Sequence, residues 1–191
     1  MARKIEFERA EVLQNALDLF WKKGYQNTTV RDLTSATGLN ESSLYNTFGN
    51  KHAIFMRTLK LYQQTMSGEL MAFSVNRSPR EAIELIWRWL VKNTADDSNP
   101  GCMLLNAANE IGHEDEVVRQ YVLLAYRRLE DMVCDLISKA QQAYEINTTQ
   151  DARKLARFMV LTFQGLKSSA VLNLNKQAVD EVVDVTLSVL D

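Results

Sequence analysis

Glycine and proline are scarce in this chain. Its 191 residues include 7 Gly and 2 Pro, which is about 5% of the chain against an average near 12%. A β-sandwich or barrel needs many more turns than these residues can supply. The composition therefore predicts long helices with few connections and excludes an all-β fold.

Cysteines and long apolar runs are also scarce. Cys102 and Cys134 are far apart and form neither a CxxC pair nor a disulfide framework, which indicates a reducing, intracellular compartment. No run approaches the roughly 18 apolar residues that a membrane-spanning helix needs. The N-terminal segment lacks the apolar core of a signal peptide. We therefore expect a soluble, cytoplasmic protein with no membrane partner.

Neither sign of charge is in large excess. The net charge is −2, and the 46% hydrophobic and 24% charged residues are ordinary for a globular protein. The charge is unevenly placed, however: residues 1–60 carry nine Lys or Arg and six Asp or Glu, whereas the remainder carries thirteen and eighteen. A basic N-terminal third is expected if only that end meets a polyanion.

Hydrophobic periodicity and helix-boundary residues predict nine helices and no strand. Eight of them span about residues 7–23, 28–37, 41–48, 51–73, 102–111, 114–144, 151–173 and 176–190. The remaining helix begins at Ser78 and Pro79 and ends before a loop at 95–101, and a turn is expected at 146–150. We expect an all-α, nine-helix architecture.

Residues 28–48 have the spacing of a helix-turn-helix, with Gly38 in the turn. Apolar residues are spaced to pack both short helices on the first one, namely Val30, Leu33, Leu39, Leu44 and Phe48. The second helix then presents polar groups suited to base edges and phosphates, namely Glu41, Ser42, Ser43, Tyr45 and Asn46. Spacing alone also fits a small helical subdomain with no role in DNA binding.

The strings GYQNTTVRDL from Gly24 and GLNESSLYNTF from Gly38, followed by Asn50-Lys51, resemble the DNA-binding domain of the TetR/AcrR family of bacterial transcriptional regulators. The resemblance implies two domains: a helix-turn-helix DNA-binding domain at residues 1–50, and an effector-binding and dimerisation domain at residues 51–191. It further implies a homodimeric repressor that a small-molecule effector releases from a palindromic operator in double-stranded DNA.

The resemblance also implies which side chains meet DNA. Phosphate contacts are expected from Thr28, Thr29 and Lys51, and a contact to the DNA backbone from Tyr45. Ser42, Ser43 and Asn46 are expected to face bases or nearby phosphates. Glu41 could accept from cytosine, but we expect it to stabilise the N-terminus of its own helix instead.

The segment from Pro100 to Glu110 is similar to the start of the sixth helix in one group of these regulators, beside the effector cavity. It places Asn106, Asn109 and Glu110 on an otherwise apolar or small helix, as a small-molecule pocket requires. Asn106 could equally bridge helices in a packed core. The expected pocket residues are Trp87, Cys102, Asn106, Tyr126 and Phe163.

The predicted helix at 151–173 carries small residues along one stripe, which lets a second helix approach closely. Phe163 to Leu166 resemble the family's eighth helix, so this helix and the last one are expected to form a four-helix bundle across a two-fold axis. The expected dimer contacts are Phe158, Gly165, Leu166 and Ser169.

Two alternatives remain open. Cys102 at a helix N-terminus could make the protein a thiol-based redox or electrophile sensor, although a lone cysteine is usually a small buried hydrophobe. The fold could instead serve as a protein-interaction module without DNA binding. We expect no cofactor, no metal and no enzymatic activity, because the chain lacks a nucleophile–base pair, a metal quartet and a phosphate-binding glycine loop.

Overall fold

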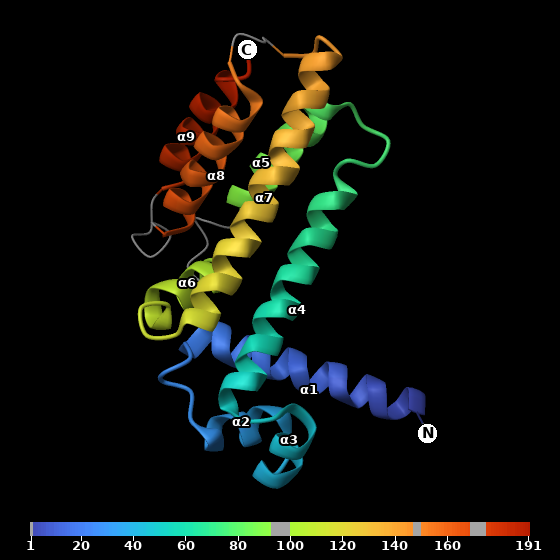
Figure 1. Ribbon diagram of the computed structural model, residues 1–191, viewed down its shortest axis with the longest axis vertical. Coiled ribbons are helices and arrows are strands. Elements are labelled where there is room, and N and C mark those ends of the chain that lie inside the picture. The colour runs from blue at the N-terminus through green and yellow to red at the C-terminus, as the bar shows by residue number, and fades with distance from the viewer. Residues whose placement is uncertain (1, 93–99, 147–149, 169–174) are drawn as a thin grey trace. The chain divides into compact units, whose positions relative to one another are not determined.

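The computed structural model describes residues 2–92, 100–146, 150–168 and 175–191. Within these ranges the chain forms nine α-helices and no strand (Figure 1). The helices are α1 Ala2–Lys23, α2 Val30–Thr37, α3 Glu41–Phe48, α4 Lys51–Ala72, α5 Pro79–Lys92, α6 Met103–Ile111, α7 Glu116–Gln142, α8 Ala152–Ser168 and α9 Lys176–Ser188. The predicted all-α class is confirmed. The predicted loop at 95–101 and turn at 146–150 lie mostly outside the described residues.

Short local signals set the ends of α2. Thr29 is its N-cap: the Thr29 hydroxyl accepts from the Asp32 backbone N–H at 3.1 Å, and the Asp32 carboxylate accepts from the Thr29 N–H at 2.8 Å. Gly38 ends the helix with φ 71°, a left-handed conformation that glycine adopts without a Cβ penalty. The helix thus begins two residues after Thr28, where the sequence pattern placed its start.

The next two helices begin with asparagine caps. Asn40 Oδ1 accepts from the Ser43 N–H at 2.8 Å, and Asn50 Oδ1 accepts from the Ala53 N–H at 2.9 Å. Such caps satisfy backbone donors that the first helical turn leaves without partners. The recognition helix predicted at 41–48 therefore has the observed bounds Glu41–Phe48.

The chain divides into two compact units. Unit 1 comprises Met1–Met66 and Met103–Gln120, and unit 2 comprises Ser67–Cys102 and Tyr121–Asp191. Unit 1 is larger than the predicted DNA-binding domain because the first part of α4, α6 and the start of α7 pack with the first three helices. The functional boundary at residue 50 stays a prediction.

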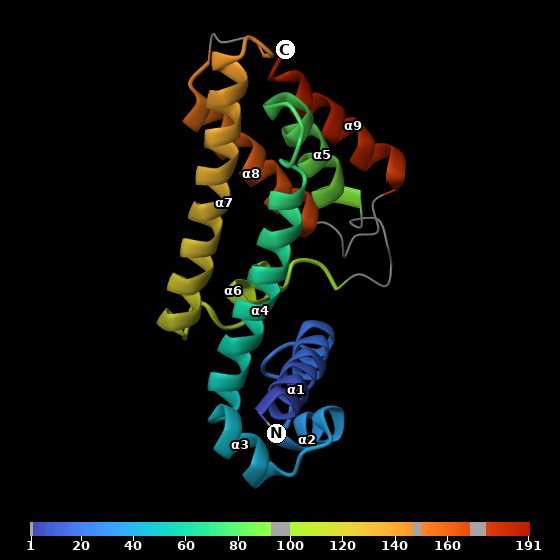
Figure 2. The same cartoon turned by 90° about the vertical axis from the view of Figure 1, so that its right-hand side faces the viewer.

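The core of unit 1 holds the two short helices in place. Figure 2 shows α2 and α3 beside α1 and the start of α4. The buried apolar side chains are Ala16, Leu17 and Phe20 from α1, Leu33 from α2, Leu44 and Phe48 from α3, and Ile54, Phe55, Leu59 and Tyr62 from α4. The rings of Phe20 and Phe55 meet edge to face, with centroids 5.0 Å apart. One apolar side of α3 is thereby buried and its other side left outward.

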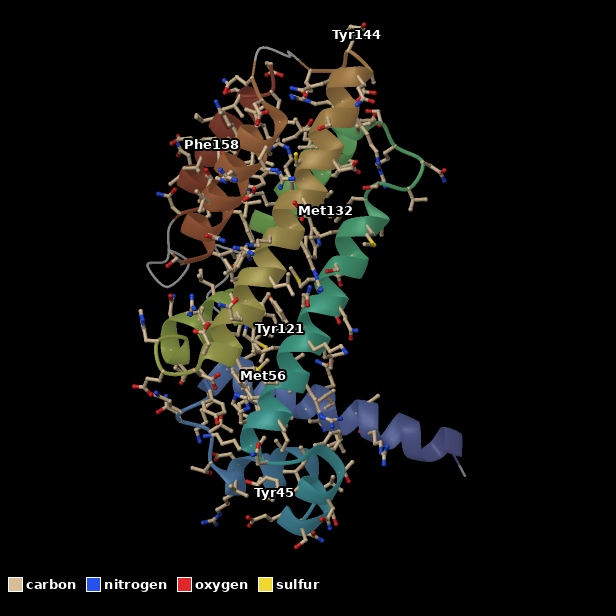
Figure 3. All side chains as sticks on the ribbon, in the orientation of Figure 1. Tyr45, Met56, Tyr121, Met132, Tyr144 and Phe158 are labelled. Atoms are coloured by element: carbon tan, nitrogen blue, oxygen red, sulfur yellow. The ribbon has the colours of Figure 1, made fainter. Side chains whose placement is uncertain are left out.

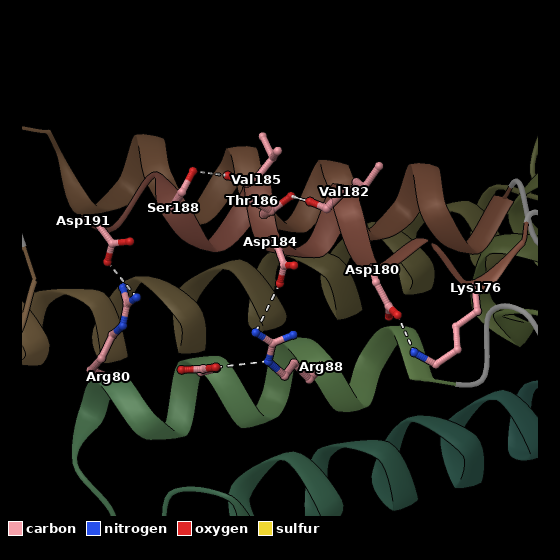
Figure 4. Close-up of polar contacts among 11 residues, drawn as sticks. Arg80, Arg88, Lys176, Asp180, Val182, Asp184, Val185, Thr186, Ser188 and Asp191 are labelled. Carbon is pink, nitrogen blue, oxygen red and sulfur yellow. Dashed lines mark hydrogen bonds and ion pairs between the residues drawn. The ribbon is translucent and has the colours of Figure 1, made fainter. Parts of the chain in front are cut away.

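Unit 2 is held mainly by apolar faces. Within it α5 packs against α8 and α9, and the core includes Ile83, Ile86, Leu155, Val183 and Leu187. Arg80 pairs with Asp191 at 2.8 Å and Arg88 with Asp184 at 3.2 Å between α5 and the C-terminal segment (Figure 4). Exposed ion pairs contribute little stability, so burial holds these helices together. No helix in the described ranges is long and apolar enough to span a membrane.

Candidate nucleic-acid interface

The outward side of α3 is polar along its whole length. Glu41, Ser42 and Asn46 are exposed, whereas Leu44 and Phe48 are buried. Ser43 and Tyr45 are half-buried at the edges of this polar side, and Figure 3 labels Tyr45 on the helix. Hydroxyl and amide groups on a rigid eight-residue helix are the donors and acceptors that read base edges and phosphates. Four of the predicted DNA contacts therefore lie together.

The two threonines before α2 have different surroundings. Thr28 is fully buried, and its hydroxyl donates to the Gly24 carbonyl at 2.6 Å. Its side chain therefore lies in the core and has no exposed group for the phosphate contact expected from the sequence, so we do not carry that contact forward. Thr29 is exposed at the N-terminus of α2, where backbone donors and the helix dipole favour an anion.

Lys51 is held at the start of α4 by an aromatic ring. Its Nζ lies 4.4 Å from the centroid of the Tyr25 ring, a cation–π distance. Burial lowers the pKa of Lys51, and the nearby charge of Glu110 acts in the opposite direction. The ring thus stabilises a half-exposed ammonium at the start of α4.

The carboxylate of Glu110 on α6 accepts two hydrogen bonds from the turn between α1 and α2. Its Oε2 accepts from the Tyr25 N–H and its Oε1 from the Gln26 N–H, both at 2.8 Å. A Cβ at Gly24, where φ is 81°, would lie 2.8 Å from Glu110 Oε1. Glu110 was expected among the polar groups beside a pocket, but its carboxylate faces this turn. The contact joins residues 84 and 85 positions apart, so no local pattern could indicate it.

A second polar contact joins α4 to the start of α7. His52 Nε2 lies 2.7 Å from Asp115 Oδ2. Burial acts to raise the pKa of Asp115, but the Val118 backbone N–H and the His52 ring outweigh burial and leave this pKa lowered. Together with Glu110, this pair ties α6 and α7 to the helices that carry the polar side of α3.

The predicted effector residues do not all fall in the same unit. Trp87, Cys102, Tyr126 and Phe163 belong to unit 2, whereas Asn106 belongs to unit 1 and is exposed. The rings of Trp87 and Phe163 are in contact, with centroids 6.4 Å apart. Cys102 Sγ lies 3.4 Å from Tyr126 Oη. An effector pocket formed by these residues stays a prediction.

The predicted dimer contacts differ in exposure. Phe158 is 45% exposed, and Gly165 is also exposed. Figure 3 labels Phe158 on α8. Leu166 is 5% exposed and packs in the core of its own protomer, so it is not available to a partner. Ser169 lies outside the described residues. The structure adds exposed apolar side chains that the sequence reasoning missed, namely Leu161 on α8 and Val182 and Val185 on α9. Leu161 follows Phe158, and Val185 follows Val182, by three residues, and this spacing places each pair on one side of its helix. It was the sequence signal from which these contacts could have been predicted.

In the parts of the chain that the structure describes, no three His, Cys, Asp or Glu side chains gather as metal ligands. The polar side of α3 is thus the clearest candidate surface for a macromolecular ligand. It combines exposed hydrogen-bonding groups with a positioned ammonium at Lys51.

Comparison with known proteins agrees with this geometry. A family model described as bacterial regulatory proteins, tetR family, matches residues 12–58, and one described as tetracyclin repressor-like, C-terminal domain, matches residues 81–186. The uncharacterized HTH-type transcriptional regulator YezE of Bacillus subtilis (strain 168) is 32% identical, with 100% of both chains covered. The HTH-type transcriptional repressor ComR of Escherichia coli (strain K12) is 25% identical over 95% of this chain and 88% of its own.

A solved structure is similar over almost the whole chain. It contains a cysteine mutant of the TetR family transcriptional regulator CifR complexed with 26-bp double-strand operator DNA. The TM-score is 0.82 and the identity 25%, covering 94% of this chain and 95% of that one.

Proposed function

This chain belongs to the TetR family of bacterial regulatory proteins, and from this premise we propose that it is a homodimeric repressor that a small-molecule effector releases from its operator. DNA-binding transcriptional regulation, rather than catalysis, is the activity of the family. The observation that carries the proposal is the polar outward side of α3, held on a core that buries Leu44 and Phe48.

DNA recognition is assigned to α3 and the residues around it. Ser42, Ser43 and Asn46 read base edges in the major groove, and Tyr45 meets the DNA backbone. Thr29 and Lys51 meet phosphates at two neighbouring helix starts. The operator complex of CifR and the repressor name of ComR support this assignment.

Two copies are needed for a palindromic operator. The exposed apolar side chains of α8 and α9, Phe158, Leu161, Val182 and Val185, suit burial against the same helices of a second chain. A dimer then presents two α3 helices about 34–36 Å apart, one turn of DNA.

The effector acts by favouring a different separation of the two α3 helices. To change operator occupancy from 99:1 to 1:99 it must favour that state by about 5.5 kcal/mol. Helices α4 and α7 contribute residues to both units. The Glu110 and His52 contacts then connect α6 and α7 to the helix-turn-helix.

The test is selection of bound fragments from random DNA, followed by titration of the selected duplex at several salt concentrations. Asn46→Ala should weaken binding to the selected duplex by about 1–3 kcal/mol and binding to scrambled DNA much less. Lys51→Ala should weaken binding to both and reduce the salt slope by about one.

Lys60→Ala is the control for Lys51→Ala, since Lys60 is an exposed lysine on the same helix. It should leave the salt slope unchanged. If the wild-type protein shows no salt-sensitive affinity for any duplex at low ionic strength, the fold serves protein interactions instead and the proposal fails.

Thiol sensing by Cys102 is the weaker candidate. Its side chain is only 6% exposed, whereas redox-sensing cysteines are solvent-accessible thiolates.

A further inference from the structure

One buried donor lacks an acceptor in the part of unit 2 that the structure describes. Trp87 is 1% exposed, and its Nε1–H has no hydrogen-bond partner among the described residues. Buried polar groups are nearly always hydrogen-bonded, because an unmet one retains its full desolvation penalty. An indole N–H can only donate, so the missing partner must be an acceptor.

A cation lies one helical turn from the ring that touches Trp87. Phe163 contacts Trp87, and Lys167 follows Phe163 by four residues on α8, so both point to the same side of that helix. Lys167 is half-buried, and burial lowers its pKa, opposed by the nearby Cys102 sulfur. No carboxylate of the described residues contributes to that shift. Within the described residues, no carboxylate therefore offsets the desolvation of this ammonium.

Cys102 connects Lys167 to α7. Its sulfur is the nearby group that acts on the pKa of Lys167, and its Sγ lies 3.4 Å from Tyr126 Oη on α7. We call the whole set the Trp87 cluster, comprising Trp87, Cys102, Tyr126, Phe163 and Lys167. Every member belongs to unit 2. The cluster joins apolar ring surfaces to two donors, the indole N–H and the ammonium.

We propose that the Trp87 cluster binds the effector through a carboxylate, which accepts from Trp87 Nε1–H and pairs with the ammonium of Lys167. This inference rests on the proposed function, since it names the chemical class of the effector. One ammonium is matched by one negative charge, and carboxylate oxygens suit both donors. The Trp87 and Phe163 rings suit an apolar or aromatic body on the acid.

The test uses three acids, each with its carboxamide: benzoate, phenylacetate and hexanoate. Ligand binding is measured as a thermal shift of the full-length protein and as release of the selected operator duplex. At least one acid should raise Tm and release the duplex, and its amide should do neither. Lys167→Met and Trp87→Phe should each weaken that acid about tenfold, the loss of a charge-assisted hydrogen bond.

Two controls keep the result specific. Lys154→Met removes an exposed ammonium from the same helix and should leave acid affinity unchanged. Cys134→Ser removes the thiol that lies outside the cluster and should likewise leave acid affinity unchanged. Lys167→Met should not lower the Tm of the unliganded protein, because it removes a half-buried charge whose desolvation is unfavourable.

The inference is overturned if no acid acts at millimolar concentration, if amides act as strongly as acids, or if Lys167→Met binds the acid as wild type does. Operator binding without any acid is measured separately. Operator binding with no acid response defeats the inference alone. Acid binding by a protein that binds no duplex defeats the proposed function and leaves the carboxylate site standing.

Discussion

The two compact units expose opposite kinds of surface. Unit 1 presents the polar side of α3, with Ser42 and Asn46 outward, whereas unit 2 presents apolar side chains of α8 and α9, with Phe158 and Val185 outward. A polar, hydrogen-bonding helix suits a wet, charged ligand such as DNA. An apolar helix face suits burial against another protein surface. The two surfaces therefore differ in the kind of partner that each suits.

The units are alike in how their helices begin. In both, side chains just before a helix accept from a backbone N–H three positions on, such as Asn40 before α3 in unit 1 and Asp151 before α8 in unit 2. Which helices then lie together depends on residues far apart in the sequence, such as Trp87 and Phe163, whose rings are in contact. The starts of these helices are therefore specified locally, whereas their arrangement depends on packing.

The largest expected effect comes from placing a charge among the exposed apolar side chains of α8 and α9 in unit 2. Val185→Asp puts a charge on a side chain that is 66% exposed in the protomer and that we expect to be buried in the dimer. Analytical ultracentrifugation should show a monomer, and operator binding should be lost with it. Met71→Asp is the control, since Met71 is 65% exposed but lies on α4. A dimer that survives Val185→Asp would place the interface elsewhere.

The next effect concerns the long-range contact of unit 1. Glu110→Ala leaves two backbone N–H groups without their carboxylate, which should destabilise the fold by about 2–3 kcal/mol in urea unfolding. Glu110→Gln keeps one acceptor oxygen and should lose about half of that amount. Glu114→Ala, at a neighbouring exposed glutamate, should change little. Equal effects at both positions would remove the structural role of Glu110.

Matched helix caps sharpen the comparison further. Asn40 caps α3 in unit 1, and Asn175 caps α9 in unit 2 by accepting from the Ala178 N–H at 2.8 Å. Each change to alanine should lower stability by about 1 kcal/mol. Only Asn40→Ala should also weaken binding to the selected duplex, because it frays α3, the helix that we propose reads the DNA. If both variants bind equally well, α3 does not read the DNA.

The smallest effect is a pH dependence in unit 1. The hydrogen bond from Lys23, followed by those from Thr29, holds the pKa of Asp32 well below its usual range. A lowered folded-state pKa gives stability that is complete above the ordinary carboxyl pKa of about 4 and is lost as the pH falls through the folded value. Near neutral pH the wild type should therefore have a higher Tm than Asp32→Asn. This difference should be smaller than the Tm loss in a cap variant such as Asn40→Ala, because the Lys23–Asp32 pair is exposed.

The Tm difference between wild type and Asp32→Asn should become smaller as the pH is lowered below the ordinary carboxyl pKa. Thermal unfolding at several pH values measures it. In Lys23→Met the same comparison should give a smaller difference, since the main cause of the lowered pKa is gone. A difference that is independent of pH would show that Asp32 acts only as a helix-start residue.

The predictable part of the site was the part that depends on nearby residues. Gly38 and Asn40 mark the turn and the start of α3, and the polar residues on its outward side followed from the spacing of Leu44 and Phe48. Thr28 was misplaced because a threonine before a helix can either cap it or turn inward, and only the core around Gly24 decides between them.

Contacts across the sequence were not predictable in this way. The Glu110 contact with the α1–α2 turn and the His52–Asp115 pair join segments that share no local pattern. Leu166 lay on an apparently suitable stripe of α8, but packing within the protomer buries it.

Helix type, the bounds of α3 and its polar side were determined by the amino-acid sequence alone, because periodicity and capping act over three or four residues. Tertiary structure alone decided that Glu110 binds the α1–α2 turn, that Leu166 faces inward and that the Nε1–H of Trp87 is buried. Each of these depends on which distant helix supplies the neighbouring atoms, and a single helix's pattern does not contain that information.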